Sequence, residues 1–239
     1  MILITPVFVA LAPLAIPVPA QAQYSHDAQA VIARARAASG GTAWNTLRGW
    51  HETGTDGAAA YERWIDPLRY GMRVEMHEGA GGGPPVVRGF NGAGEWGISP
   101  AGQQTGTGDA GRLATARTED FYGVYGFLYA SRFDAHGRLV GEKRAGGRNF
   151  DVVLVEPWRA AARELWFDRS TGLLGRMIER DGARTLTVEL SDYRKVGPLK
   201  VAFRFVSSDG PEGAARVRQI RTLDFAPADR AMFSLPAQP

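Results

Sequence analysis

The feature that most constrains the fold is a run of apolar-rich segments in the second half of the chain. From Phe150 to Phe225 these segments are about 6–10 residues long and are separated by short polar turns. In the sharpest example, Glu164–Glu179, two such segments flank the polar loop Asp168–Gly172, which is typical of a β-hairpin. Consecutive hairpins predict a long antiparallel meander. Since the run contains no catalytic motif, a sheet with a binding role is favoured.

The N-terminus has the pattern of an export signal. Its first 22 residues carry no charged side chain and are apolar from Ile2 to Val18, and Ala20 and Ala22 match the small-residue cleavage pattern. A transmembrane anchor is the alternative, but prolines interrupt the run and no second long apolar stretch follows. We therefore expect a signal peptide over residues 1–22 and one periplasmic domain over residues 23–239.

Composition excludes several kinds of site. The chain has no cysteine, which excludes disulfides, thiolate metal sites, a cysteine nucleophile and the acceptor of a bacterial lipid anchor. Its net charge is +3, and the arginines alternate with acidic residues along the chain. No basic stripe of the kind that binds nucleic acid is present. We expect a protein that is neither lipid-anchored nor an integral membrane protein.

The first half combines one helix with alternating strands. Ser25 or Asp27 can cap a short helix that runs to Ala38 and ends at Gly40-Gly41. From Leu68 to His77 apolar and polar residues alternate, which predicts a strand with one buried face. Further strands are expected at 46–53, 58–65, 86–90 and 95–99, with a turn at Asn91-Gly92 between the last two.

A second helical region follows a polar loop. Residues 101–111 are expected to be a loop, and Gly111–Phe133 to be helical with Thr118 as N-cap. Gly123 and Gly126 weaken this helix, so packing must hold it in place. Later strands are expected at 139–143, 150–156, 161–168, 173–180, 184–193, 198–206 and 215–225. The predicted fold is mainly β: one curved antiparallel sheet of about eleven strands, covered by short helices.

Motifs for common chemistries give little support for an enzyme. Two G-x-G-x-x-G matches, at 92–97 and 106–111, lie outside any βαβ unit, and no G-x-S-x-G is present. The Asp-Gly pairs lack the hydroxyl residue of aspartic proteases and are expected to be turns. His51 and His77 are the best candidates for a site assembled across strands. We expect no catalytic residue, no metal and no cofactor.

Methionine and aromatic residues are the candidates for a binding surface. Most of them are expected to form ordinary core, but such side chains also line pockets for flexible apolar ligands. The candidate cavity residues are Trp64, Tyr70, Met72, Val74, Met76, Trp96, Phe121, Tyr122, Tyr125, Leu128, Tyr129 and Trp166. Arg63, Arg69 and Arg73 are candidates for contacting a head group.

Several turns and strand ends resemble those of a known family. They are Gly40-Gly41, Gly54, Tyr61–Asp66, Gly89–Trp96, Glu164–Leu174, Ser191–Arg194, Gly197–Lys200 and Asp224–Pro236 with its closing Phe233–Pro236. Together they resemble the LolA/LolB-like superfamily of periplasmic, outer-membrane lipoprotein-sorting-type proteins. The similarity is greatest to a branch that also occurs ahead of retropepsin-like aspartic proteases.

This resemblance implies an incomplete β-barrel of about eleven strands, covered by helices, with an apolar cavity for acyl chains. The expected function is a non-catalytic carrier of an apolar or lipidic ligand, either lipoprotein acyl chains or lipid. One alternative is a module that docks another cell-envelope protein. Another is the accessory domain type found beside aspartic proteases, here without the catalytic motif. An enzyme whose site is assembled across strands is a further alternative.

Overall fold

The computed structural model describes residues 23–79, 83–106, 109–129, 132–210 and 213–236. Within these ranges one sheet of fourteen strands is accompanied by two α-helices and three 3-10 helices. The expected signal peptide, residues 1–22, lies outside them. In this part of the chain no helix has both the length and the apolar character needed to cross a bilayer.

The elements alternate short helices with long runs of strands. The helices are α1 (His26–Ser39), η1 (Gly41–Thr46), α2 (Ala110–Gly123), η2 (Gly126–Leu128) and η3 (Arg230–Phe233). The strands are β1 (Gln23–Tyr24), β2 (Trp50–Asp56), β3 (Ala59–Asp66), β4 (Gly71–His77), β5 (Val86–Phe90), β6 (Glu95–Ile98), β7 (Gln104–Gly106), β8 (Ala135–Ala145), β9 (Arg148–Pro157), β10 (Arg163–Asp168), β11 (Leu174–Asp181), β12 (Arg184–Val196), β13 (Leu199–Asp209) and β14 (Arg216–Asp224).

The sheet consists of two meanders joined at one seam. Strands β2 to β7 pair in chain order, as do β8 to β14, and β14 then pairs antiparallel with β2. Only the two-residue β1 is parallel to its neighbour, β8. The outermost strands β1 and β7 are not paired with each other, so the sheet is open. The mainly β fold with one open antiparallel sheet is therefore confirmed, with more strands than expected.

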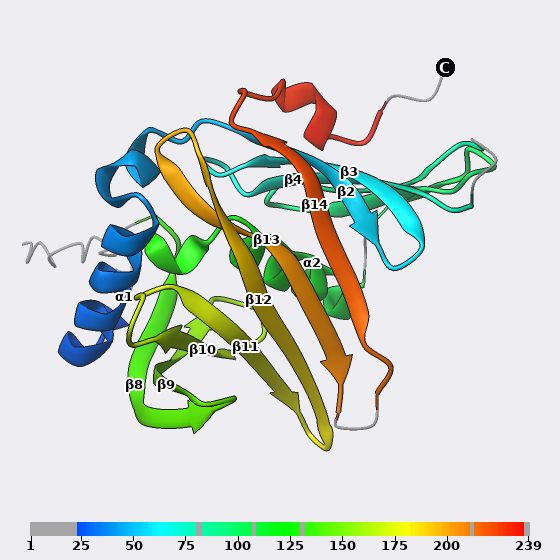
Figure 1. Cartoon of the computed structure of the whole chain (residues 1–239). Coiled ribbons are helices and arrows are strands. Elements are labelled where there is room, and N and C mark those ends of the chain that lie inside the picture. Colours follow the sequence, from blue (N-terminus) through cyan, green and yellow to red (C-terminus); the bar gives the residue numbers. More distant parts are fainter. Residues whose placement is uncertain (1–22, 80–82, 107–108, 130–131, 211–212, 237–239) are drawn as a thin grey trace, which may run out of the picture.

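Topology explains why a helix covers the concave face. In the strand order β7 is the last strand, whereas β8 lies beside the opposite edge. The connection between β7 and β8 must therefore pass across the sheet, and α2 belongs to this connection. Figure 1 shows α2 in the space between the two meanders. The prediction that short helices cover the sheet is consistent with this crossing.

Local signals determine α1 and the sharpest hairpin. The Ser25 hydroxyl accepts a hydrogen bond from the backbone N–H of Ala28 and caps α1. In the hairpin β10–β11, Asp168 Oδ1 accepts hydrogen bonds from the backbone N–H groups of Ser170 and Thr171. Gly172 closes this loop with a φ of 74°. Both predicted elements are confirmed.

Other boundaries differ from the prediction. Asp109, not Thr118, caps α2, because its carboxylate accepts hydrogen bonds from the N–H groups of Gly111 and Arg112. The helix ends at Gly123, and Tyr125 with a φ of 55° separates it from η2. The expected loop 101–111 contains β7. Strand β4 begins at Gly71, because the turn after Asp66 ends at Tyr70 with a φ of 63°.

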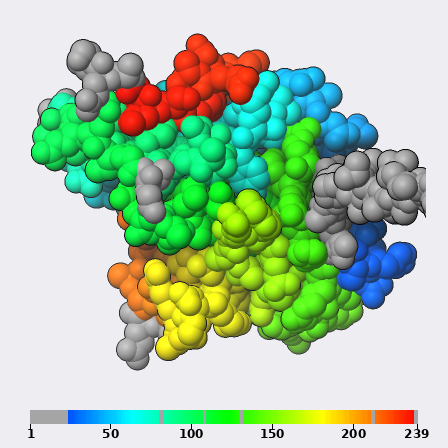
Figure 2. Space-filling model, turned by 180° about the vertical axis from the view of Figure 1, so that it is seen from behind, coloured from blue at the N-terminus to red at the C-terminus, as the bar shows by residue number. Residues whose placement is uncertain are grey.

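The C-terminal segment packs on the outer face of the first meander. Trp96 Nε1 donates to the carbonyl oxygen of Phe233 at 2.8 Å, and η3 contacts β4. Arg73 extends from the same outer face and donates to the carbonyl oxygen of Met232 at 3.4 Å. Figure 2 shows this red segment lying across the cyan and green strands. The two faces of β4 are thus covered by different parts of the chain.

Candidate functional site

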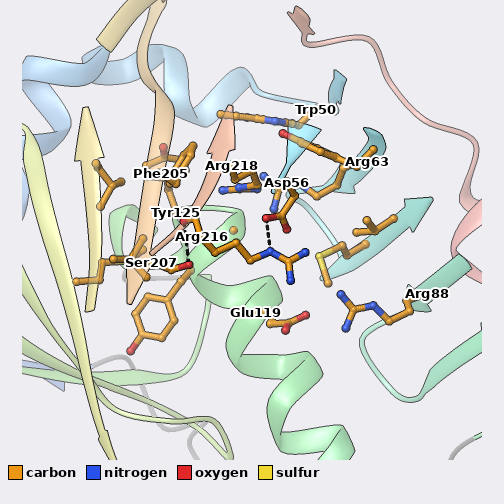
Figure 3. Close-up of a pocket in the computed structure, with 18 of the residues that line it drawn as sticks. Trp50, Asp56, Arg63, Arg88, Glu119, Tyr125, Phe205, Ser207, Arg216 and Arg218 are labelled. Carbon is orange, nitrogen blue, oxygen red and sulfur yellow. Dashed lines mark hydrogen bonds and ion pairs between the residues drawn. The ribbon is translucent and has the colours of Figure 1, made fainter. Parts of the chain in front are cut away.

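A cavity of about 250 Å³ lies between α2 and the concave face of the sheet. Its walls are mostly apolar and come from both meanders and from the end of α2 (Figure 3). The apolar and aromatic lining residues are Trp50, Tyr61, Met72, Val74, Met76, Tyr122, Tyr125, Leu174, Met177, Val188, Leu190 and Phe205. Three of them are methionines, whose flexible side chains adapt to ligands of irregular shape.

Strand alternation determines which side chains reach this cavity. On β4, Met72, Val74 and Met76 line it, as Val188 and Leu190 do on β12. Residues two apart on a strand share a face, so β4 and β12 contribute every second side chain to the wall. The intervening Arg73 of β4 points outward, where its guanidinium pairs with Glu75 at 2.7 Å.

A charged cluster around the buried Glu52 lies at one end of the cavity. Glu52 is fully buried, and its Oε1 lies 2.8 Å from an Arg63 guanidinium nitrogen and 3.2 Å from one of Arg218. The Tyr61 hydroxyl and Trp50 Nε1 also donate hydrogen bonds to this carboxylate, at 2.9 and 2.7 Å. We call these five residues the Glu52 cluster. They come from β2, β3 and β14, which meet at the seam of the sheet.

The Glu52 cluster contains one more positive charge than negative. Burial would raise the pKa of Glu52, but the charges of Arg63 and Arg218 and the hydrogen bonds from its neighbours lower it below its ordinary value. Burial and the neighbouring charge of Arg63 lower the pKa of Arg218. One carboxylate thus faces two guanidinium groups, of which Arg63 is buried and Arg218 is partly buried. Arg63 Nε is itself buried, with no hydrogen-bond partner among the described residues.

The opposite end of the cavity is open and polar. Arg88, Glu119 and Arg216 are exposed there, whereas Trp50 and Arg63 at the cluster end are buried (Figure 3). Arg216 Nε forms an ion pair with Asp56 Oδ1 at 2.5 Å. A neighbouring cavity of about 390 Å³ is also lined by Met72, Val74, Arg88 and Glu119. An elongated ligand could therefore extend from the first cavity past β4.

Five of the twelve residues predicted for the cavity line it: Met72, Val74, Met76, Tyr122 and Tyr125. Phe121, Leu128 and Tyr129 lie in the main core, and Tyr70 packs against it. The remaining three, Trp64, Trp96 and Trp166, do not line this cavity. Trp64 stacks on His51, Trp96 binds the C-terminal segment, and Trp166 packs with Phe150, Val152 and Ile178 in a second cluster. Ligand contact by any of the twelve stays a prediction.

The other predicted polar candidates are dispersed. Of the three arginines proposed for a head group, only Arg63 lines the cavity, since Arg69 pairs with Asp66 and Arg73 with Glu75. His51 lies outside the cavity lining, between Glu62 at 2.7 Å and Asp224 at 3.2 Å. His77 is likewise absent from the lining residues. Among the described residues no three His, Asp or Glu side chains are placed to hold a metal ion.

Sequence reasoning missed Glu52, Arg218 and Asp120. Asp120 is a fully buried residue of α2, and neither of its carboxylate oxygens has a hydrogen-bond partner among the described residues. Burial raises the pKa of Asp120 well above its ordinary value, and the nearby charge of Arg63 offsets only part of this effect. The only feature of the sequence that could have indicated Asp120 was an acidic residue within a predicted helix. Nothing local marked Glu52 or Arg218.

Replacing Asp120 with asparagine should change how stability depends on pH. The unfolded chain releases this proton near pH 4, whereas the folded chain keeps it to higher pH, so wild-type stability falls as the pH rises above about 4. The groups that influence Asp120 most are Arg63 and Asp66. Asparagine does not titrate. The stability of the variant minus that of the wild type should therefore be larger at pH 8 than at pH 4.5.

Urea unfolding at the two pH values measures this difference. The control is Asp181→Asn at the exposed end of β11, and the pH effect of Asp120→Asn should exceed that of this control. If the pH effect of Asp120→Asn did not exceed that of the control, the carboxyl group would not be holding its proton in the folded state.

Comparisons with known proteins bear on the fold. No protein-family model matches the sequence, and no curated protein matches it. Among solved structures, a LolA superfamily protein from Nitrosomonas europaea superposes with a TM-score of 0.59 at 14% identity, covering 87% of this chain and 97% of that one. The chain has the LolA-type fold. The predicted LolA/LolB-like resemblance is thus confirmed at the level of the fold.

Two further structures agree. A DUF1329 family protein from Desulfovibrio piger has a TM-score of 0.52 at 11% identity and covers 88% of this chain and 98% of its own. A domain from Vibrio parahaemolyticus, named for outer membrane lipoprotein sorting, has a TM-score of 0.51 at 12% identity, with 84% and 92% covered. At these identities the similarity establishes the LolA-type architecture, whereas the ligand must be argued from the site.

Proposed function

We propose that this protein is a non-catalytic periplasmic carrier that binds the acyl chain of a lipidic ligand in the cavity beneath α2. The observation that carries the proposal is the cavity itself, whose wall is formed mostly by methionine, aliphatic and aromatic side chains. Burying an acyl chain there would remove its methylene groups from water, and each buried methylene would contribute about 0.8 kcal/mol to the binding free energy. The LolA-type fold is in keeping with this role.

The size of the cavity favours a single chain. Its volume of about 250 Å³ is slightly below the roughly 300–1,000 Å³ of typical small-molecule pockets. A longer chain could continue into the neighbouring cavity, which shares Met72 and Val74 with the first. Affinity should therefore rise with each added methylene until the apolar wall is fully covered, and then level off.

The proposal is tested by extracting the purified protein with organic solvent and identifying co-purified lipids by mass spectrometry. In parallel, an uncharged apolar dye, N-phenyl-1-naphthylamine, is titrated into delipidated protein and then displaced with dodecanol. We expect a co-purified acyl lipid and a fluorescence increase that dodecanol reverses. Absence of both would contradict the carrier function and would favour a role in docking an envelope protein.

Localisation is tested separately. We expect the full chain, expressed in a Gram-negative host, to be recovered from the periplasmic fraction with residues 1–22 removed. Intact-mass measurement would give the position of the cleavage. Recovery of an uncleaved chain from the cytoplasm would contradict export.

A further inference from the structure

The charges around the cavity are unevenly balanced. Five arginines line it, namely Arg63, Arg88, Arg163, Arg216 and Arg218, together with only two carboxylates, Asp56 and Glu119. Arg216 pairs with Asp56, and Arg163 pairs with Glu179 behind the wall at 2.8 Å. Arg88 and Glu119 are exposed to solvent at the open end. This leaves Arg63 and Arg218, which share the single carboxylate of Glu52.

The surplus charge lies at the closed end of the cavity. Arg63 is only 8% exposed, and its Nε has no hydrogen-bond partner among the described residues. Arg218 stacks over the ring of Phe205 with 4.0 Å between its guanidinium carbon and the ring centroid. Arg218 is 23% exposed and Arg63 is buried, so both cations have lost much of their contact with water while sharing one counter-charge, which is unfavourable. An anion entering the cavity would supply the missing charge.

Asp120 does not supply it. It is the other buried carboxyl group whose pKa is affected by Arg63, but its own burial favours the protonated form. It is also absent from the residues that line the cavity. The cavity thus combines apolar walls with a positively charged inner end.

We infer that the ligand is a single-chain amphiphile with a small anionic head group, a carboxylate or a phosphate monoester, which enters head first and pairs with Arg63 and Arg218. The acyl chain then runs along Met72, Val74 and Met76 toward the open end. This inference rests on the proposed carrier function and narrows its ligand class. A lipoprotein, whose acyl chains are attached to a polypeptide, could not place its head group at the inner end.

Matched ligands test the inference at pH 8, where a fatty acid is ionised. Isothermal titration calorimetry compares dodecanoate, dodecyl phosphate and dodecanol, which share a chain length and differ in the head group. One charge-assisted hydrogen bond contributes about 1.5–3 kcal/mol, so at least one anion should bind about 10- to 140-fold more tightly than the alcohol. The preferred anion identifies the head group.

Substitutions of single arginines test which of them produces the preference for an anionic head group. Arg218→Met leaves Glu52 and Arg63 as a one-to-one pair, so it should reduce the preference for the anion to about onefold while dodecanol still binds. Arg218→Lys keeps the charge and should retain most of the preference. Arg221→Met, an exposed arginine on the same strand that does not line the cavity, should leave it unchanged.

The outcomes separate the two proposals. Equal binding of dodecanol and both anions to the wild type would overturn the head-group inference and leave the carrier function in place. No binding of any of the three ligands would overturn both. Because the wild-type comparison requires no substitution, it decides the inference even if Arg218→Met does not fold. An unchanged preference in a folded Arg218→Met protein would place the anion elsewhere.

Discussion

Replacing Glu52 with glutamine should lower the free energy of unfolding by about 3–5 kcal/mol, the typical cost of removing one partner from a buried ion pair. Glu52 is fully buried and is the shared acceptor of Arg63, Arg218, Trp50 and Tyr61. Glutamine has a similar shape but no charge, so the buried Arg63 and the partly buried Arg218 would be left without a counter-charge. Urea unfolding followed by far-UV circular dichroism measures the change.

The matched control is Glu62→Gln on β3, whose side chain is 36% exposed and pairs with His51. Its loss should cost about 1 kcal/mol or less, as is usual for an exposed ion pair. The double variant Glu52→Gln/Arg218→Met should recover part of the lost stability, because only one unpaired arginine remains. If Glu52→Gln lowered the free energy of unfolding no more than Glu62→Gln does, the folded protein would not need Glu52 as the counter-charge of Arg63 and Arg218.

Replacing Val188 with tryptophan should weaken the binding of a dodecyl ligand about tenfold or more. Val188 is partly buried on β12 and lines the cavity. An indole at this position would fill space that the dodecyl chain of the ligand needs. Displacing two methylene groups at about 0.8 kcal/mol each accounts for a factor of this size. Dye displacement and calorimetry with dodecanol and dodecanoate measure the effect.

Val217→Trp is the control for this variant. Val217 is also partly buried, but it alternates with Arg216 and Arg218 on β14 and so faces away from the cavity. Its replacement should leave the affinity unchanged. Equal affinities of Val188→Trp and the wild type, with both proteins folded, would mean that the chain binds elsewhere.

The elements that could be predicted are those determined by neighbouring residues. The Ser25 cap, the Asp168–Gly172 loop and the alternation of β4 each depend on contacts within a few positions along the chain. For α2 the predicted start at Gly111 is close to the observed Ala110, but the predicted N-cap, Thr118, is wrong. The true cap, Asp109, lies in a stretch rich in glycine and threonine, a composition that is typical of loops.

The site was only partly predictable for a related reason. Alternation along the strand predicts that Met72, Val74 and Met76 share one face of β4. Which of the two faces lines a cavity depends on the segments that cover each side of the strand. Figure 1 shows η3 packed on the outer side of this meander and α2 on the inner side. Both segments are distant from β4 in the sequence, so no local pattern could assign the faces.

A meander of hairpins, a capped first helix and a set of apolar residues able to line a cavity follow from the amino-acid sequence. The charged inner end of this cavity does not, because it depends on pairing between distant strands. Glu52 and Arg218 are 166 positions apart and meet because β14 pairs with β2. The charge and pKa of a buried group depend on its spatial neighbours, and here the seam of the sheet supplies them.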